Sequence, residues 1–270
     1  MRPFPYAISS SILAAAVLVA SLPLAWSDDS PLAPGAEAPG GAKPPTASAE
    51  KRIVASDGCH LTVRYHSSAV AEADVEGEDA TALGAVRVLG KSKSFFADAD
   101  AHVSDLFSPP RPQRQPRIHV EGPSPYASAF VKLDAPASGE SEHPCGGTDG
   151  IILIGAVEVV KCECAGCLCK EHELTVAVSG ELNGVGRSSG SPASWGFEAA
   201  LNGVPFGRKP PAKFSIPFSR TVKVRVPTGA RVTVYVLRIG YTANNGTDGS
   251  ASLTLSAFAN ETVVGAKCLR

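Results

Sequence analysis

Four cysteines within eight residues form the sequence pattern with the clearest chemical potential. They are Cys162, Cys164, Cys167 and Cys169, in the segment CECAGCLC. Ala165-Gly166 stands where a two-residue β-turn would fall, and such a hairpin places Cys164 opposite Cys167 and Cys162 opposite Cys169. Because side chains alternate between the two faces of a strand, all four sulfur atoms would then share one face.

This arrangement is compatible with three chemical states of the cysteines. Opposite residues of a hydrogen-bonded pair have Cα atoms about 5.5 Å apart, a distance that a disulfide accepts. Four thiolates with C-x-x-C spacing also suit a structural zinc or another soft metal. A redox-active C-x-x-C is disfavoured because no thioredoxin-like βαβ pattern surrounds it. Exported thiols are oxidised unless a metal arrives first, so we expect two cross-strand disulfides, with zinc as the alternative cofactor.

Three further cysteines complete the seven in the chain, namely Cys59, Cys145 and Cys268. A bridge from Cys59 to Cys145 or Cys268 would join the first strand to the rest of the fold. The odd total leaves at least one thiol without an intrachain partner if no metal binds, and that thiol could link two chains into a dimer. The hairpin disulfides would close very short loops, so we expect them to contribute at most about 2 to 3 kcal/mol.

Catalytic patterns are weak in this sequence. Residues 186–190, Gly-Arg-Ser-Ser-Gly, match the G-x-S-x-G nucleophile elbow, but that motif requires a strand that runs into a helix. Here Ser191-Pro192-Ala193 and another strand pattern follow, so we expect a loop without a catalytic serine. The six histidines are scattered, without the His-x-x-x-His spacing of zincin-type enzymes. A carboxylate pair of the glycosidase type stays open, because its separation is set by the fold.

The first 27 residues have the organisation of a secretory signal peptide. Arg2 precedes an apolar run over residues 8–24, and Ala25-Trp26-Ser27 stands before two aspartates. The apolar run of about 17 residues is short for a membrane span, which favours cleavage over anchoring. We therefore expect a secreted, periplasmic or cell-surface protein with no transmembrane segment after cleavage.

Residues 28–52 follow as a Pro/Ala/Gly-rich spacer or propeptide. This composition offers too few large apolar side chains to offset the entropy cost of ordering, and it is typical of disorder. Lys51-Arg52 at its end is either a dibasic processing site or a pair of solvated charges at the start of a strand.

From Ile53 onward the apolar residues recur with the period of two that indicates β-strands. Cys59, Leu61, Val63 and Tyr65 share one face of the first such segment. Strand patterns cover residues 59–66, 85–89, 95–103, 126–133, 151–160, 174–182, 195–201, 204–206, 222–226, 232–236 and 250–258. The segment 151–160 is almost wholly apolar, which is typical of a central strand covered on both faces.

Turn residues between these segments indicate antiparallel hairpins. Asn202-Gly203, Pro227-Thr228-Gly229 and Asn244-Asn245-Gly246 are each predicted to pair the two strands that flank them. A Pro/Arg-rich connector at residues 108–117 interrupts the strand pattern, since proline cannot donate to a ladder. The sequence therefore predicts an all-β fold, an antiparallel β-sandwich of Ig-like or jelly-roll-like type with long Pro/Gly-rich loops, in one domain over residues 53–270.

The charge balance and two short motifs restrict the partners. A net charge of −1 and a pI near 6.6 argue against a nucleic-acid partner, which normally requires a basic face. Asn245 and Asn260 each begin an Asn-x-Thr sequon, so both are possible glycosylation sites in a eukaryotic secretory pathway.

The preferred interpretation is a secreted non-catalytic β-sandwich with a binding, adhesion or surface-structural role and a protein or glycan ligand. The first alternative is a secreted protein that binds zinc or another soft metal through the CxCxxCxC segment. The second alternative is an extracellular hydrolase whose carboxylate site leaves no local motif.

Overall fold

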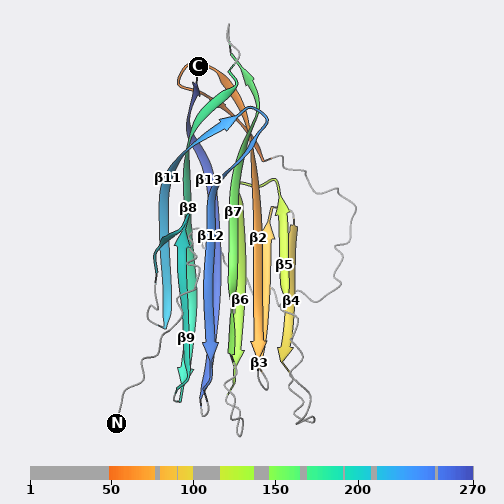
Figure 1. Cartoon of the computed structure of the whole chain (residues 1–270), viewed down its shortest axis with the longest axis vertical. Coiled ribbons are helices and arrows are strands. Elements are labelled where there is room, and N and C mark those ends of the chain that lie inside the picture. The colour runs from red at the N-terminus through yellow and green to blue at the C-terminus, as the bar shows by residue number, and fades with distance from the viewer. Residues whose placement is uncertain are drawn as a thin grey trace, which may run out of the picture.

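Two antiparallel β-sheets pack face to face in this computed structural model, with their strands along the long axis of the molecule (Figure 1). The structure describes residues 49–76, 80–89, 91–99, 116–136, 146–164, 169–190, 192–207, 212–246 and 249–269. Every regular element in these ranges is a β-strand, and they contain no helix with the length and hydrophobicity that crossing a membrane requires. The predicted all-β class and the antiparallel sandwich are confirmed.

The first sheet has seven strands in the described part of the chain. Their bounds are Glu50–Val54 (β1), His60–Glu76 (β2), Arg117–Gly122 (β5), Gly146–Glu163 (β7), Ser194–Leu201 (β9), Val204–Pro205 (β10) and Arg231–Asn244 (β12). The order is β1-β2-β7-β12-β9-β10, and β5 pairs with a later stretch of β2.

The second sheet has six strands among the same residues. Their bounds are Ala80–Val88 (β3), Lys91–Ala99 (β4), Tyr126–Ala135 (β6), Glu171–Ser189 (β8), Lys213–Pro227 (β11) and Ser250–Leu269 (β13). The order is β11-β8-β13-β6-β3-β4, so strands far apart in the sequence, such as β8 and β13, become neighbours.

Alternation of side chains explains why these segments form a sandwich. In β8 the buried residues Leu174, Val176, Val178 and Leu182 alternate with partly exposed ones. The inward side chains of both sheets form one cluster made mainly of Val, Leu, Ile and Ala. Removing this apolar face from water stabilises strands that pairing alone would leave marginal.

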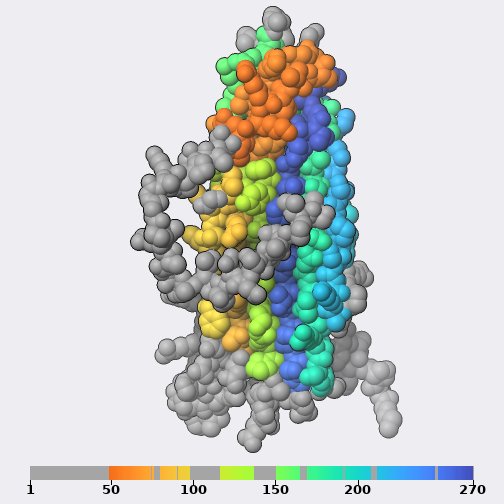
Figure 2. Space-filling view, turned by 180° about the vertical axis from the view of Figure 1, so that it is seen from behind, coloured from red at the N-terminus to blue at the C-terminus, as the bar shows by residue number. Residues whose placement is uncertain are grey.

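Several strands are unusually long. β2, β7, β8 and β13 contain 17, 18, 19 and 20 residues, whereas strands of about five or six residues are typical. At about 3.3 Å per residue, β13 extends over about 65 Å. The sandwich is therefore elongated, as Figure 2 shows.

The predicted hairpin at Asn202-Gly203 is confirmed. Val204 of β10 pairs with Leu201 of β9, and the φ angles of Asn202 and Gly203 are 51° and 79°. Two consecutive positive φ angles are what a type I′ turn requires, and Asn-Gly is its preferred sequence.

The other two predicted hairpins are wrong. β11 and β12 lie in different sheets, and so do β12 and β13. β11 pairs with β8 along its whole length, while β12 pairs with β7 and β9. The turn residues reverse the chain direction at both places, but they carry no information about which sheet receives the next strand.

The predicted central strand at 151–160 lies within β7, between β2 and β12, as expected. Only one face of this strand is fully buried, with Leu153 and Val157 inward. Ile152 and Ile154 on the other face are partly exposed. The expectation of cover on both faces is therefore wrong, because the seven-stranded sheet packs against the other sheet on one side.

The first strand begins at Glu50, earlier than the predicted domain boundary at Ile53. Lys51 and Arg52 are exposed residues of β1, and Glu50 forms an ion pair with Arg64 of β2 at 2.7 Å. The predicted signal peptide and residues 28–48 of the spacer lie outside the described residues, as do residues 108–115 of the connector.

The β9–β10 turn yields a test of the backbone geometry. Replacing Gly203 by alanine is expected to lower the free energy of unfolding by about 1 kcal/mol, because an L side chain is strained at a φ of 79° although no atom lies near the new Cβ. Gly196 is the matched control, since its added Cβ would meet only Thr242 Oγ1 at 3.7 Å, an ordinary contact. Urea unfolding of both variants should show a loss for Gly203→Ala and little change for Gly196→Ala.

Candidate functional site

Four strand ends meet at one end of the sandwich, near the C label in Figure 1. Cys59 precedes β2, Cys164 follows β7, Cys169 precedes β8, and Cys268 lies near the end of β13. Two disulfides form here, Cys59–Cys164 and Cys169–Cys268, with Cα–Cα distances of 4.5 Å and 5.9 Å.

Each disulfide joins two neighbouring strands of the same sheet. His60 of β2 lies opposite Glu163 of β7, directly beside the Cys59–Cys164 bond. Cys268 of β13 lies opposite His172 of β8, beside the other bond. The disulfides therefore fasten the last ladder positions of the two sheets, where strand ends open most easily.

The pairing expected from the sequence is wrong. Cys164 bonds to Cys59 instead of Cys167, and Cys169 bonds to Cys268 instead of Cys162. The hairpin assumption failed because β7 and β8 belong to different sheets, so no ladder places Cys162 opposite Cys169. The expected bridge from Cys59 to Cys145 or Cys268 is also wrong, because Cys59 bonds to Cys164.

Two of the candidate cysteines, Cys145 and Cys167, lie outside the described residues. Cys162 lies at the end of β7, partly buried, with its Sγ atom 3.2 Å from the Sγ atom of Cys164. Three of the four cysteines of the CxCxxCxC segment are thus placed together, and Cys59 and Cys268 join them from distant parts of the chain.

His172 is a member of this site that the sequence analysis missed. Its side chain is fully buried, with Nδ1 3.5 Å from the Sγ atom of Cys169. Its Nε2 lies 3.0 Å from the hydroxyl oxygen of Thr228, which donates to the carbonyl oxygen of Cys169 at 3.3 Å. Burial lowers the pKa of His172, partly opposed by the charge of Asp57, so the imidazole is held in its neutral form. His172 is two residues before Leu174 and therefore lies on the same face of the strand, so the sequence could have indicated that its side chain is buried.

Asp57 ties the same end of the molecule to β13. Its carboxylate accepts hydrogen bonds from the backbone N–H groups of Cys59 at 3.4 Å and of Cys268 at 3.0 Å. One side chain therefore orients a cysteine of each disulfide, which fixes the spacing between the two bridges.

Two groups of metal-ligating atoms result from this arrangement. The sulfur atoms of Cys59, Cys162 and Cys164 form one group, and Cys162, Cys169 and His172 form the other. Within each group the ligand atoms lie within 4.8 Å of one another. Disulfide sulfur atoms are not thiolates, so the groups become a donor set only when the bridges are reduced.

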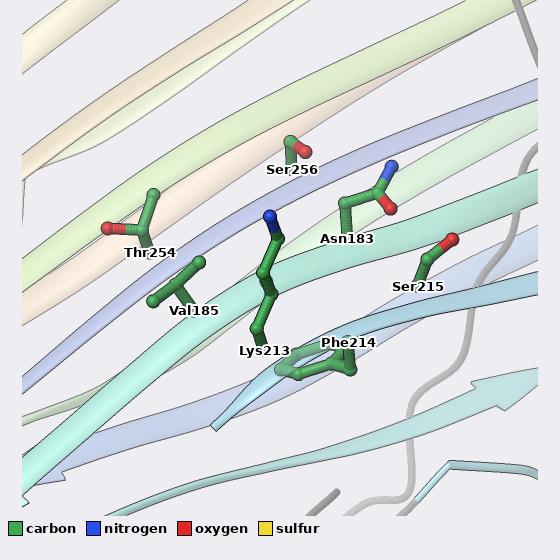
Figure 3. Close-up of a pocket in the computed structure, with 8 residues that line it drawn as sticks. Asn183, Val185, Lys213, Phe214, Ser215, Thr254 and Ser256 are labelled. Carbon is green, nitrogen blue, oxygen red and sulfur yellow. The ribbon is translucent and has the colours of Figure 1, made fainter. Parts of the chain in front are cut away.

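A different site lies on the outer face of the six-stranded sheet. Figure 2 shows this face, with β4, β3 and β6 on one side of β13 and with β8 and β11 on the other. A shallow groove of 440 Å³ crosses it, lined by Asn183, Gly184, Val185, Lys213, Phe214, Ser215, Thr254 and Ser256 (Figure 3).

Strand register builds the polar part of this groove. Ser215 of β11 and Ser256 of β13 lie on either side of Asn183 of β8, in one row across three strands. Lys213, Val185 and Thr254 form the next row. Side chains of one row are close neighbours, so hydroxyl and amide groups from three strands converge on the groove.

Aromatic side chains lie beside these polar rows. Phe130 of β6 is in register with Ser256 and is partly exposed. Phe258, two residues further along β13, stacks on Tyr126 with ring centroids 5.6 Å apart. Polar groups and aromatic faces are therefore adjacent on the same sheet surface.

The floor of the groove is tightly packed. The ring of Phe214 lies over Gly184, where an added Cβ would meet its Cζ atom at 2.2 Å. Phe214 stacks against both Trp195 and Phe197 of β9, with ring centroids 6.4 Å and 4.8 Å away. Such packing fixes the backbone of β8 and β11 beneath the polar groups, so the groove is preformed.

The other motifs of the sequence do not form a site. Ser188 and Ser189 are exposed residues at the end of β8, the Oγ atom of Ser189 lies 2.9 Å from that of Ser250, and the next element is the strand β9. The nucleophile-elbow geometry, a strand running into a helix, is therefore not found at this motif.

The two sequon asparagines differ in exposure. Asn245 is fully buried and its amide donates to the carbonyl oxygen of Pro136 at 2.6 Å, which leaves no room for a glycan in the folded chain. Asn260 lies inside β13, partly exposed, and its amide oxygen accepts from Ser179 at 2.5 Å. Burial therefore argues against glycosylation at Asn245, while Asn260 stays a prediction.

Comparison of this chain with known protein families, with curated proteins and with solved structures found no match. The chemistry of its own surfaces is therefore the source of the functional proposal that follows.

Proposed function

We propose that this chain is an exported, non-catalytic β-sandwich that binds carbohydrate on the outer face of its six-stranded sheet. The observation that carries this proposal is the groove of hydroxyl and amide side chains next to partly exposed aromatic rings. A sugar presents polar hydroxyl groups and apolar C–H faces, which the polar side chains and the aromatic rings of this surface can each contact.

Sugar hydroxyl groups both donate and accept hydrogen bonds, and the lining side chains can meet both needs. The amide of Asn183 offers two donors and an acceptor, while the hydroxyl groups of Thr254 and Ser256 each donate and accept. The C–H faces of a sugar ring pack on aromatic rings, and Phe258, stacked on Tyr126, is partly exposed on the same sheet surface. Strands hold all these groups, so little ordering is required on binding.

The form and charge of the groove favour binding of an extended chain over catalysis. The groove is shallow and lies on the sheet surface, so a ligand can extend beyond it. Lys213 is the one charged residue among its described lining residues, which therefore provide no pair of carboxylates for glycoside cleavage. Glu181 lies beside the groove and accepts a hydrogen bond from Ser215.

Export is part of the proposal. The predicted signal peptide and the two disulfides both fit an oxidising compartment, where cysteine pairs are stable. In that compartment, the polysaccharides of a cell wall, matrix or envelope are accessible ligands for an elongated binding protein.

Affinity gel electrophoresis tests this function, because binding to a soluble neutral polysaccharide in the gel slows the migration of the protein. The double change Asn183→Ala and Ser256→Ala is expected to weaken binding about tenfold, since two neutral hydrogen bonds together contribute about 1.4 kcal/mol. The matched control is Thr242→Ala, an exposed polar residue of β12 on the opposite sheet, which should bind as the wild type does.

Two outcomes would contradict the proposal. One is the absence of retention across a panel of glucans, galactans, xylans and mannans. The other is retention that the groove variant and the wild type show equally.

A further inference from the structure

We propose that the reduced chain holds one tetrahedral zinc-type cation through Cys162, Cys164, Cys169 and His172. This site lies at the end of the sandwich where the disulfides are found, and it is independent of the carbohydrate groove. Its ligand set differs from the one that the sequence suggested, because an imidazole takes the place of Cys167.

The ligand atoms form two overlapping groups that share Cys162, and the two distances between neighbouring ligand atoms are close to those around a tetrahedral ion. Zinc with Zn–S bonds near 2.3 Å places its sulfur ligands roughly 3.8 Å apart. The Sγ atoms of Cys162 and Cys164 are 3.2 Å apart, and Nδ1 of His172 is 3.5 Å from the Sγ atom of Cys169. The ligand atoms of Cys162, Cys169 and His172 lie within 4.8 Å of one another, whereas Cys164 is grouped with Cys162 and Cys59. The Cys164 side chain must therefore move towards Cys169 and His172, which reduction of its bond to Cys59 permits.

His172 is oriented as a metal ligand. The hydroxyl of Thr228 donates to the carbonyl oxygen of Cys169, so it accepts the Nε2–H of His172. Nδ1 then carries a lone pair that faces the Sγ atom of Cys169. In the oxidised chain that sulfur bears no hydrogen and does not donate to Nδ1, so the lone pair of this buried nitrogen is directed at the cysteine cluster. A second partner on the far nitrogen is typical of metal-bound histidines.

The metal would make a connection that the disulfides do not make. Each disulfide joins strands within one sheet. The proposed ligands come from the end of β7 in the seven-stranded sheet and from the start of β8 in the six-stranded sheet. A bound ion therefore joins the two sheets directly, and it can hold this end of the sandwich closed after both bridges are reduced.

The chemical step is a balanced exchange. An external dithiol reduces each disulfide by two electrons and two protons, and it becomes a disulfide itself. Zinc then displaces the thiol protons of Cys162, Cys164 and Cys169 and accepts the Nδ1 lone pair of His172. Reoxidation of the thiolates by a disulfide oxidant re-forms the bridges and releases the ion.

Two double variants separate this site from nonspecific binding by thiols. C59S/C268S and C164S/C169S each remove the two disulfides of the described residues and the same number of cysteines, but only the first keeps all four proposed ligands. Cobalt, followed by zinc, is titrated anaerobically into each protein. We expect C59S/C268S to bind one cobalt with the visible bands of a tetrahedral thiolate site, zinc to displace it, and C164S/C169S to show no such bands.

A third variant tests the histidine. Adding His172→Gln to C59S/C268S is expected to weaken cobalt binding at least tenfold, whereas adding His119→Gln, an exposed histidine of β5, should leave it unchanged. The same titration of the reduced wild-type chain should give one equivalent. Absence of stoichiometric binding by C59S/C268S, whether or not its β-sheet circular dichroism is retained, would overturn the proposal, and so would equal binding by C164S/C169S.

Discussion

Replacing Cys169 and Cys268 together by serine is expected to lower the free energy of unfolding by about 4 to 5 kcal/mol. The two cysteines are 99 residues apart in the sequence, so their bond removes a large loop-closure entropy from the unfolded chain. A typical domain is stable by about 5 to 15 kcal/mol, so this single bond accounts for a large share of the total.

The Cys59–Cys164 disulfide is the matched comparison. It spans 105 residues, and the loops that the two bonds close follow each other in the sequence without overlap. We therefore expect C59S/C164S to lose a similar amount and the two losses to add. Urea unfolding of the oxidised proteins at one pH measures both. A loss below about 2 kcal/mol for either pair would indicate that the bond constrains only local structure, as a short hairpin bridge would.

The sequence predicted short-loop disulfides, whereas both observed disulfides close long loops. Alternation of apolar residues located parts of most strands, because a one-residue shift in β8 would turn Leu174, Val176 and Val178 out of the core, but it missed β1 and β5. The sequence did not indicate which sheet each strand joins. A turn such as Pro227-Thr228-Gly229 ends a strand in the same way whether the next strand pairs with it or crosses to the other sheet. The cysteine pairing depended on that assignment, and it failed at the crossing from β7 to β8.

The candidate sites were hidden for the same physical reason. Asn183 and Ser256 lie opposite each other only through the register of β8 and β13, which are separated by tens of residues in the chain. His172 follows Cys169 by three residues, and the alternation of β8 places its side chain on the buried face. It was missed because the six histidines show no spacing that is typical of a metal or catalytic site. Local chemistry was therefore accessible from the sequence, whereas sites assembled by register were not.

A buried carboxylic acid between the sheets is the second feature with a large expected effect. Glu261 of β13 is 1% exposed, and neither of its oxygens nor the Tyr235 hydroxyl has a hydrogen-bond partner among the described residues. Gly155 makes the space for them, because a Cβ there would lie 2.0 Å from a carboxylate oxygen of Glu261. Burial raises the pKa of Glu261 well above its ordinary value.

Glu261→Gln is therefore expected to stabilise the protein at pH 8, by more than about 1 kcal/mol. The folded chain retains the Glu261 proton above pH 4.5, its ordinary pKa, while the unfolded chain loses it, so the stability of the wild type falls as the pH rises towards the raised pKa. Glutamine does not ionise, so the difference in the free energy of unfolding between the two proteins should grow from about pH 4.5 upward.

Urea unfolding from pH 4 to pH 8 measures this difference, with the exposed Glu198→Gln as a control that should change stability by less than about 0.5 kcal/mol. A wild type and a Glu261→Gln variant with parallel pH profiles would show that the carboxyl group ionises without cost inside the sandwich.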